Sequence, residues 1–370
     1  MKKIERKILL NPGPATTTDS VKYAQVAPDI CPRENEFGKI MESVALDLVK
    51  IAGGSKKEYA CVLFGGSGTA AMDAVINSVI SPAGKILVIN NGAYGKRMAE
   101  IAKTYKIDYT ELKFDWDKLP ELQKIEMLLK KDRKINCVAV VHHETTTGLL
   151  NPIEEIGVLA KKHKKIFIVD AISSFAGVPF DIKKAKADFV MATSNKCIQG
   201  MAGIAFVICK KSELEKIKDF PRRSYYLSLY DQYDYFQKNF QTRFTPPVQT
   251  IYALRQAIDE FLKEGYGRRA ARYAKNWQIL RDGVEKLGFR ILTKPEQEAK
   301  ILITILYPEN PNFNFDKLHD KLYKKGYTIY PGKIGKQNAF RLANMGAIGE
   351  KDIKNFLKEF SNVLGKMKVI

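Results

Sequence analysis

Residues 166–200 read IFIVDAISSFAGVPFDIKKAKADFVMATSNKCIQG. Two short runs in this stretch, Ile166–Val169 and Phe189–Ala192, are almost continuously apolar, which is typical of strands covered by helices on both faces. Asp170 follows the first run, and Lys196 comes shortly after the second. Because ligands of open parallel sheets bind beyond the carboxyl ends of the strands, the stretch indicates both a fold and the place of a site.

The same alternation continues on both sides of this stretch. Segments with apolar residues three and four positions apart, such as Thr69–Ile80 and Arg97–Tyr105, predict helices between further apolar runs. These runs, which we expect to be strands, are Ala60–Phe64, Lys85–Asn90, Cys137–His142 and Ala205–Cys209. Such a β-α-β-α series predicts an α/β domain with a mostly parallel sheet.

The pattern changes after about residue 255. A long charged stretch, Gln256–Leu287, predicts one long helix, and a final amphipathic helix is expected over Lys351–Leu364. Between them lie two short apolar runs, Lys300–Leu306 and Thr328–Tyr330. We therefore expect a large α/β domain over residues 1–255 and a smaller α+β domain over residues 256–370, packed as one body.

The charge balance favours anionic small molecules as ligands. The chain has 370 residues, with 61 Lys and Arg against 41 Asp and Glu, a formal net charge of +20. The lysines are spread along the whole chain, and the arginines are not interleaved with aromatic residues as a nucleic-acid stacking platform requires. We therefore expect small-molecule substrates and no nucleic-acid partner.

The cysteines and the lengths of the apolar runs indicate where in the cell the protein is expected and whether it has a metal site. The five cysteines, Cys31, Cys61, Cys137, Cys197 and Cys209, are odd in number and include no CxxC pair, so neither a disulfide framework nor a zinc site is predicted. No apolar run approaches the length of a membrane span, and the N-terminus lacks a signal-peptide core. These features predict a cytoplasmic protein that binds no metal and no membrane.

Three features at predicted strand ends indicate a ligand site only when they are considered together. Gly65-Gly66-Ser67-Gly68-Thr69 can cradle an anion at a helix start, although an ordinary tight turn explains it equally well. Asp170 alone reads as a helix cap or ion-pair partner, and Lys196 alone as a surface residue. An anion cradle, a carboxylate and an amine together match pyridoxal 5′-phosphate (PLP), whose phosphate, ring nitrogen and 4′ carbon need these three groups. Tyr94, in Asn91–Gly95, adds a ring for stacking.

The motifs in their order resemble a known family. They are NPGPATTT, FGGSGTAAM, NNGAYGKR, HHETTTG, IVDAISSF, SNKCIQG, RFTPPVQT, YPGK and FRLANMG, from Asn11 to about Gly346. The series resembles the class V aminotransferases of fold type I, and among them the phosphonate transaminases. The resemblance implies a fold type I PLP-dependent transferase with a large, mostly parallel-sheet domain and a small C-terminal domain.

The resemblance also implies roles for individual residues. Lys196 would hold PLP as a Schiff base and move the substrate proton, and Asp170 would pair with the ring nitrogen. The other implied cofactor contacts are Ser67, Gly68 and Thr69 with Asn195 at the phosphate, Tyr94 stacked on the ring, Thr145 at the ring oxygen or phosphate, and Thr245 at the phosphate of the neighbouring subunit.

The last of these contacts makes the expected protein a homodimer with shared active sites. Arg341 would grip the acidic group of the substrate, helped by the backbone at Pro12 and Gly13 in an N-terminal arm of about 20 residues. Its planar fork suits a carboxylate or phosphonate. Arg33 has two readings: a second anion anchor at the subunit boundary, or a structural ion pair with Glu34 or Glu36.

The function implied is PLP-dependent transamination of 2-aminoethylphosphonate with pyruvate, giving phosphonoacetaldehyde and L-alanine, or the reverse. The alternative is an aminotransferase of the alanine–glyoxylate or serine–glyoxylate type. Lys196, Asp170 and Arg341 serve both reactions, so these residues do not decide between an aminophosphonate and an amino acid as donor to the 2-oxo acid.

Overall fold

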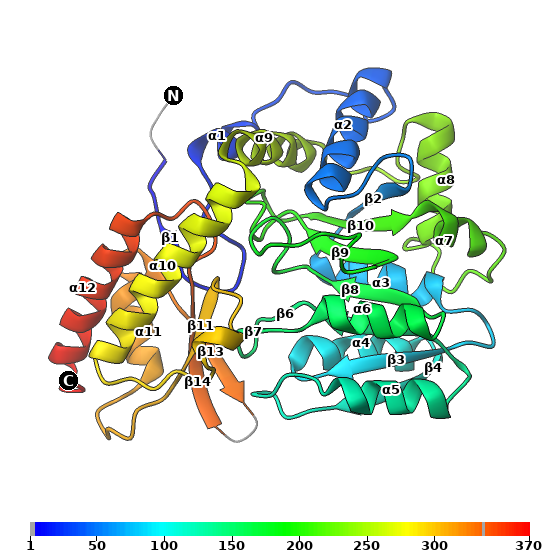
Figure 1. Ribbon diagram of the computed structural model, residues 1–370. Helices are drawn as coiled ribbons and strands as arrows, with labels where there is room; N and C mark the ends of the chain where they lie inside the picture. Colours follow the sequence, from blue (N-terminus) through cyan, green and yellow to red (C-terminus); the bar gives the residue numbers. More distant parts are fainter. Residues whose placement is uncertain (1–3, 335–336) are drawn as a thin grey trace.

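The centre of the molecule is a seven-stranded sheet with the strand order β2-β10-β9-β8-β5-β3-β4 (Figure 1). The computed structural model describes residues 4–334 and 337–370. Neighbouring strands are parallel except at β10, which runs antiparallel to both β2 and β9. The strands are β2 (Tyr59–Gly65), β3 (Lys85–Asn90), β4 (Asp108–Lys113), β5 (Ile135–Val141), β8 (Ile166–Asp170), β9 (Phe189–Thr193) and β10 (Ile204–Lys210). The predicted mostly parallel α/β sheet is confirmed.

One strand of this sheet was not expected from the sequence. β4, with the sequence DYTELK, lies at the sheet edge beside β3, and none of its residues is buried. An edge strand without a buried face lacks the apolar run by which the inner strands are found, so periodicity did not reveal it.

Helices cover both faces of the sheet and bury a separate apolar core on each. On one face pack α2 (Asn35–Ile51), α5 (Leu122–Lys131), α6 (Ile153–Lys162) and α9 (Val248–Glu264). On the other pack α3 (Gly68–Val79), α4 (Ala93–Thr104), α7 (Lys211–Lys216) and α8 (Leu229–Asn239). This three-layer arrangement explains why the inner strands are apolar on both sides.

The C-terminal part forms its own layer beside the large sheet (Figure 1). A three-stranded antiparallel sheet, ordered β11-β14-β13, packs with three helices around a third apolar core that includes Trp277, Phe340 and Phe356. Its elements are α10 (Tyr266–Lys286), a 3-10 turn at Pro295–Gln297, β11 (Leu302–Leu306), α11 (Phe315–Tyr323), β12 (Tyr327–Thr328), β13 (Tyr330–Ile334), β14 (Gln337–Ala343) and α12 (Glu350–Lys366).

The N-terminal segment joins this part of the molecule before it enters the large sheet. β1 (Ile8–Leu9) pairs in parallel with β12, and the chain then runs past the end of the large sheet to α1 (Asp19–Tyr23). Ala15 N donates to Asn195 O over 2.9 Å, which ties this arm to the turn that carries Lys196. A short β6–β7 ladder (His143–Glu144 with Leu149–Leu150) completes the element list.

The expected single helix over residues 256–287 is wrong, because the structure has two helices there. α9 ends and α10 begins at Gly265, whose φ of +80° and ψ of 146° lie in a region that only glycine adopts readily. Ile251, Leu254 and Ile258 of α9 pack in the core of the large sheet. We therefore propose that the division into a large and a small domain holds, with the boundary nearer to Gly265 than to residue 256.

Gly265→Ala is expected to lower the free energy of unfolding by about 1–3 kcal/mol, because a side chain is strained at this backbone conformation. The nearest atom to a Cβ there is Arg268 Nη2 at 3.6 Å, so the cost comes from the backbone and not from a clash. Gly267→Ala is the matched control, since it lies in α10 with open space around it and is expected to gain up to about 1 kcal/mol. Urea unfolding of both variants checks the opposite signs; equal effects would contradict the argument.

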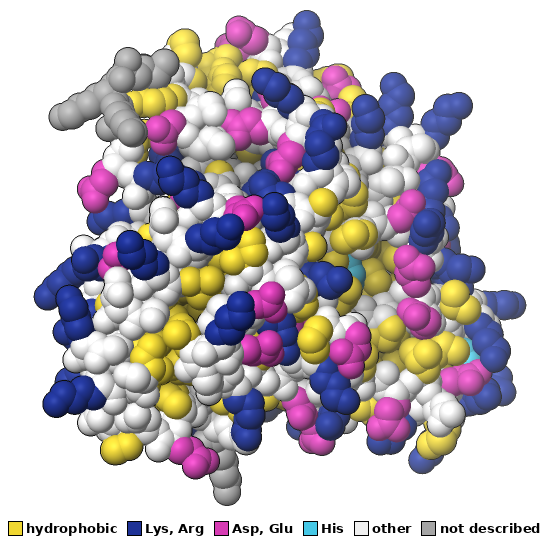
Figure 2. Space-filling view, turned by 60° about the vertical axis from the view of Figure 1, so that its left-hand side comes forward, with side chains coloured by type: hydrophobic (Ala, Val, Ile, Leu, Met, Phe, Trp, Pro, Cys, Tyr) yellow, Lys and Arg dark blue, Asp and Glu magenta, His cyan; other side chains and the backbone are white. Residues whose placement is uncertain are grey.

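The surface carries both charge signs. In the face shown in Figure 2, Lys and Arg side chains are scattered with Asp and Glu among them. No helix in the described part of the chain has both the length and the apolar character needed to cross a membrane.

Candidate active site

A cavity of about 500 Å³ opens at the carboxyl ends of the parallel strands. Strands β2, β3, β5, β8 and β9 contribute to its wall through residues at or just after their carboxyl ends. β10 runs the opposite way and contributes through Ala202 and Gly203, which precede it. The other lining residues are Gly66, Ser67, Gly68, Thr69, Tyr94, Arg97, His143, Thr145, Asp170, Ile172, Ser173, Thr193, Asn195 and Lys196. The topology thus brings residues far apart in sequence into one site.

The start of α3 forms one end of this cavity. Ser67 is the N-cap and makes no side-chain cap hydrogen bond, so its hydroxyl does not compete for the first N–H groups of the helix. A Cβ at Gly68 would come within 2.8 Å of Ile172 Cγ2, so only glycine allows the turn to approach this wall. Unpaired N–H groups and the helix dipole make this end suited to an anion.

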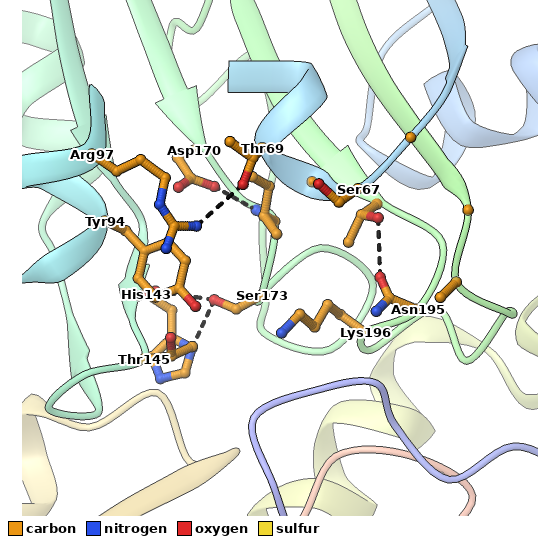
Figure 3. A pocket seen from close by; sticks show the side chains of 16 residues that line it. Ser67, Thr69, Tyr94, Arg97, His143, Thr145, Asp170, Ser173, Asn195 and Lys196 are labelled. Atoms are coloured by element: carbon orange, nitrogen blue, oxygen red, sulfur yellow. Dashed lines mark hydrogen bonds between the residues drawn. The ribbon is translucent and has the colours of Figure 1, made fainter. Parts of the chain in front are cut away.

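Arg97 and Tyr94 lie on the wall beside that end (Figure 3). The Arg97 guanidinium lies 4.7 Å from the centre of the Tyr94 ring, and its Nη1 donates to Thr69 Oγ1 over 3.2 Å. The backbone of Tyr94 is held in place by a hydrogen bond, because its N–H donates over 3.1 Å to the buried carboxylate of Glu144. Arg97 was not assigned a role from the sequence, although it stands in the NNGAYGKR motif.

Asp170 is a buried carboxylate at the end of β8. It is 2% exposed and accepts a hydrogen bond from Ile172 N over 2.8 Å. Burial raises the pKa of Asp170 to about 7, against the opposing effect of the Ile172 N–H. A cation placed beside such a carboxyl group strongly stabilises its ionised form.

Lys196 projects into the cavity from the turn after β9 (Figure 3). Its Nζ donates to the backbone oxygen of Pro12 in the N-terminal arm. Burial, and to a lesser degree the charge of Arg341, lower the pKa of Lys196 to about 8. A substantial neutral fraction is therefore available near neutral pH, as a nucleophilic amine requires.

The turn that carries Lys196 is held by two side chains of α10. Arg269 Nη1 donates to Cys197 O over 3.1 Å, and the Tyr273 hydroxyl accepts from Gln199 Nε2 over 2.6 Å. Both Arg269 and Tyr273 come from α10 and are 1% exposed. Sequence inspection missed these supports, because nothing in the charged helical stretch distinguishes them from surface residues.

Gly13 packs directly against the Lys196 side chain, and a Cβ there would overlap the end of that lysine. Gly13→Ala is expected to push the amine away from Pro12 O and to lower kcat by about 10²-fold, with added strain from its φ of +125°. Val26→Ala, in the segment after α1 and 83% exposed, is the control. Steady-state kinetics of both variants test this placement; an unimpaired Gly13→Ala would contradict it.

Arg341 contacts Thr145, which lies in the cavity wall below Tyr94 in Figure 3. Arg341 Nη1 donates to Thr145 O and Nη2 to Pro331 O, each over 3.1 Å, and the guanidinium lies 4.8 Å from the Tyr330 ring centre. Arg341 stands beside the cavity and is not among its lining residues. Thr145 Oγ1 and Arg341 Nε are buried and have no hydrogen-bond partner among the described residues.

Two of the predicted site residues, Thr245 and Arg33, lie away from this cavity. Thr245 is exposed and lines a small separate pocket with Tyr226 and Phe244. Arg33 donates to Thr242 O over 2.6 Å and to Arg243 O over 3.3 Å. Within the described residues it makes no ion pair with Glu34 or Glu36, so that reading of Arg33 is wrong.

Comparison with known proteins decides the family. The model of the class V aminotransferase family matches residues 20–334. The chain belongs to the class V aminotransferases. Relatives named 2-aminoethylphosphonate–pyruvate transaminase share 40% identity in Phocaeicola vulgatus, covering 96% of this chain and 98% of the relative, and 41% in Bacillus cereus, covering 95% and 96%.

The fold of this aminotransferase is also that of solved structures. The alanine–glyoxylate aminotransferase of Nostoc sp. superposes with a TM-score of 0.90 at 23% identity, covering 98% of this chain and 96% of that one. This likeness confirms the fold type I architecture expected from the sequence, and at this identity it says nothing of the substrate.

The cofactor of class V aminotransferases is PLP, and the cavity of this aminotransferase fits it. The start of α3 suits the phosphate, Asp170 with its raised pKa suits a cationic ring nitrogen, and Lys196 supplies the amine. The buried Thr145 Oγ1, without a partner among the described residues, is a further polar group directed to a ligand. The predicted cofactor is thereby confirmed for the family and matched by the residues present.

Proposed function

We propose that this aminotransferase transfers the amino group of 2-aminoethylphosphonate to pyruvate, forming phosphonoacetaldehyde and L-alanine, and that it also runs in reverse. The observation that carries this proposal is the full-length similarity, at 40–41% identity, to relatives named for that reaction. The cationic groups around the cavity, Lys196, Arg97 and Arg341, support a substrate with a strongly anionic end.

Lys196 and Asp170 would share the chemistry. Bound PLP supplies a 4′ carbon for the amino group and a ring that stabilises negative charge at the neighbouring carbon. Lys196 Nζ, neutral in part near pH 8, would take the proton from the substrate carbon that bears nitrogen and deliver it to the cofactor side. Asp170 would keep a proton on the ring nitrogen through its negative charge.

The remaining predicted residues would position cofactor and substrate. Ser67, Gly68, Thr69 and Asn195 would hold the phosphate, and Tyr94 would stack on the ring. Thr145 would contact the ring oxygen or the phosphate. Arg341, with the backbone at Pro12 and Gly13, would bind the acidic end of the substrate.

We propose a cytoplasmic homodimer in which Thr245 reaches the phosphate in the neighbouring subunit. Three rings beside Thr245 support an interface: Tyr225 is 78% exposed, and Tyr226 and Phe244 stack at 5.1 Å between centres. Arg33, which contacts this loop at Thr242 O and Arg243 O, would be a second anion anchor at the subunit boundary. Sedimentation of the purified protein tests the dimer, and a monomer at micromolar concentration would contradict it.

The proposed cytoplasmic location agrees with the cysteines, because all five are free thiols, as expected in a reducing compartment.

The test of the function is the visible spectrum of PLP-loaded protein. Addition of 2-aminoethylphosphonate is expected to bleach the band of the lysine-bound cofactor, and pyruvate should restore it while alanine forms. L-alanine or L-serine, with glyoxylate as acceptor, forms the comparison. Bleaching by the amino acids, with recovery by glyoxylate and no response to the phosphonate, would establish the glyoxylate-type alternative instead.

A further inference from the structure

His143 has no part in the proposed chemistry, yet it lies in the cavity wall and is 1% exposed. Its Nδ1 lies 3.0 Å from Ser173 Oγ, and Ser173 Oγ donates over 3.0 Å to the backbone oxygen of His143. A carbonyl oxygen can only accept, so the one hydroxyl proton of Ser173 is already used. Nδ1 of the imidazole must therefore carry the proton that it donates to Ser173, and Nε2 is a bare acceptor.

Nε2 of His143 is buried and has no hydrogen-bond partner among the described residues. Two more buried polar atoms without such a partner, Thr145 Oγ1 and Arg341 Nε, belong to residues joined by the Arg341–Thr145 hydrogen bond. Figure 3 places His143 and Thr145 together below Ser173, on the side toward which the amine of Lys196 points. A group of unpaired buried atoms at the cavity is the arrangement expected of a ligand site.

Burial first, and nearby positive charge second, keep this imidazole neutral. Burial, then His142 and Lys196, lower the pKa of His143 to about 3. The carboxylate of Glu144, the adjacent residue, is turned away and engaged by Thr146 and Tyr94 N. The other charged groups near it are Asp170 and Arg97 in the cavity wall and Arg341 beside the cavity. A neutral imidazole with a bare Nε2 accepts a hydrogen bond but donates none from that atom to an anionic oxygen that lacks a proton.

We propose that His143 is a specificity-determining residue that accepts a hydrogen bond from the hydroxyl of a singly protonated phosphonate. This inference rests on the proposed function and names the state of its substrate. Ionised carboxylates and sulfonates have no proton to offer at neutral pH. A phosphate ester loses its second proton near pH 6, and a carbon-bound phosphonate, without the electron-withdrawing ester oxygen, keeps that proton to higher pH. His143 therefore selects phosphonates over isosteric anions.

The test compares two non-reacting probes, ethylphosphonate and ethanesulfonate, by calorimetric binding to PLP-loaded protein at about pH 6. The wild-type protein is expected to prefer the phosphonate. His143→Leu should weaken phosphonate binding by about tenfold and leave sulfonate binding within about twofold. His143→Gln places a carbonyl oxygen near the Nε2 position and should retain part of the preference, whereas Ser173→Ala should reduce it by freeing the tautomer.

His319→Leu, at a half-buried position of α11 in the C-terminal part of the chain, is the matched control and should change neither affinity. A His143→Leu variant with an unchanged preference, or with equal losses for both probes, overturns the inference. So does a change of the cofactor spectrum with the preference intact, because His143 would then contact the cofactor. If the wild-type protein neither binds nor turns over phosphonates, the proposed function is wrong, and so is the inference that rests on it.

Discussion

Lys196→Ala is expected to lower kcat by about 10³- to 10⁴-fold and to abolish the visible band of lysine-bound PLP. Lys196 supplies the amine at the cavity, and its pKa of about 8 lets it exist as a neutral base near neutral pH. Ala removes both the covalent attachment and the proton carrier, while the anion end at α3 and Asp170 remain to hold the cofactor. Alanine formation from 2-aminoethylphosphonate and pyruvate measures the rate, and absorbance measures the attachment.

Lys196→Arg is the matched variant for this prediction. Arg keeps the positive charge and the long stem but stays protonated at every working pH, so it cannot act as a nucleophile or base. We expect it to be as inactive as Lys196→Ala while it retains the fold, checked by circular dichroism. If Lys196→Arg keeps more than about a tenth of wild-type kcat, Lys196 acts through its charge alone and its assigned role is wrong.

The sequence was sufficient to predict the inner part of the fold. Strands such as β8 and β9 are buried on both faces, so their apolar runs stand out from the helices around them. The edge strand β4 and the break at Gly265 were missed for opposite reasons. β4 has no buried face, and Gly265 interrupts a stretch whose charged residues read as helix on both sides.

The site residues divide in a similar way. Lys196, Asp170 and the turn at Ser67–Thr69 follow buried strands, so strand-end reasoning brings them to one cavity, where the structure places them. Arg97 and His143 were not among the predicted site residues, because their significance lies in contacts made across the cavity. The Arg97 contact with Thr69 and the Nδ1 contact of His143 with Ser173 join residues about 30 positions apart, and no local pattern encodes them.

Asp170→Asn is expected to lower kcat by about 10³-fold, because a neutral amide cannot keep a proton on the ring nitrogen. In the cofactor-free protein, by contrast, the same substitution should raise the free energy of unfolding. The pKa of Asp170 is raised to about 7 in the folded state, against about 3.9 in an unfolded chain. The folded state therefore holds this proton more tightly than the unfolded state, and stability is lost as pH rises from about 4 to about 7.

Because Asn resembles the protonated carboxyl, Asp170→Asn escapes that loss. Without PLP, the variant should match the wild-type protein near pH 4 and exceed its free energy of unfolding by up to about 4 kcal/mol near pH 8. Asp188→Asn is the control: this carboxylate is 1% exposed but is paired with Lys161 and with Phe167 N, so its loss should destabilise the protein near neutral pH and above. Denaturant unfolding of the three cofactor-free proteins at both pH values measures the difference. If the free energies of unfolding of Asp170→Asn and of the wild-type protein change with pH in parallel, Asp170 is already ionised before PLP binds. This carboxylate would then not depend on a cationic ring for its charge.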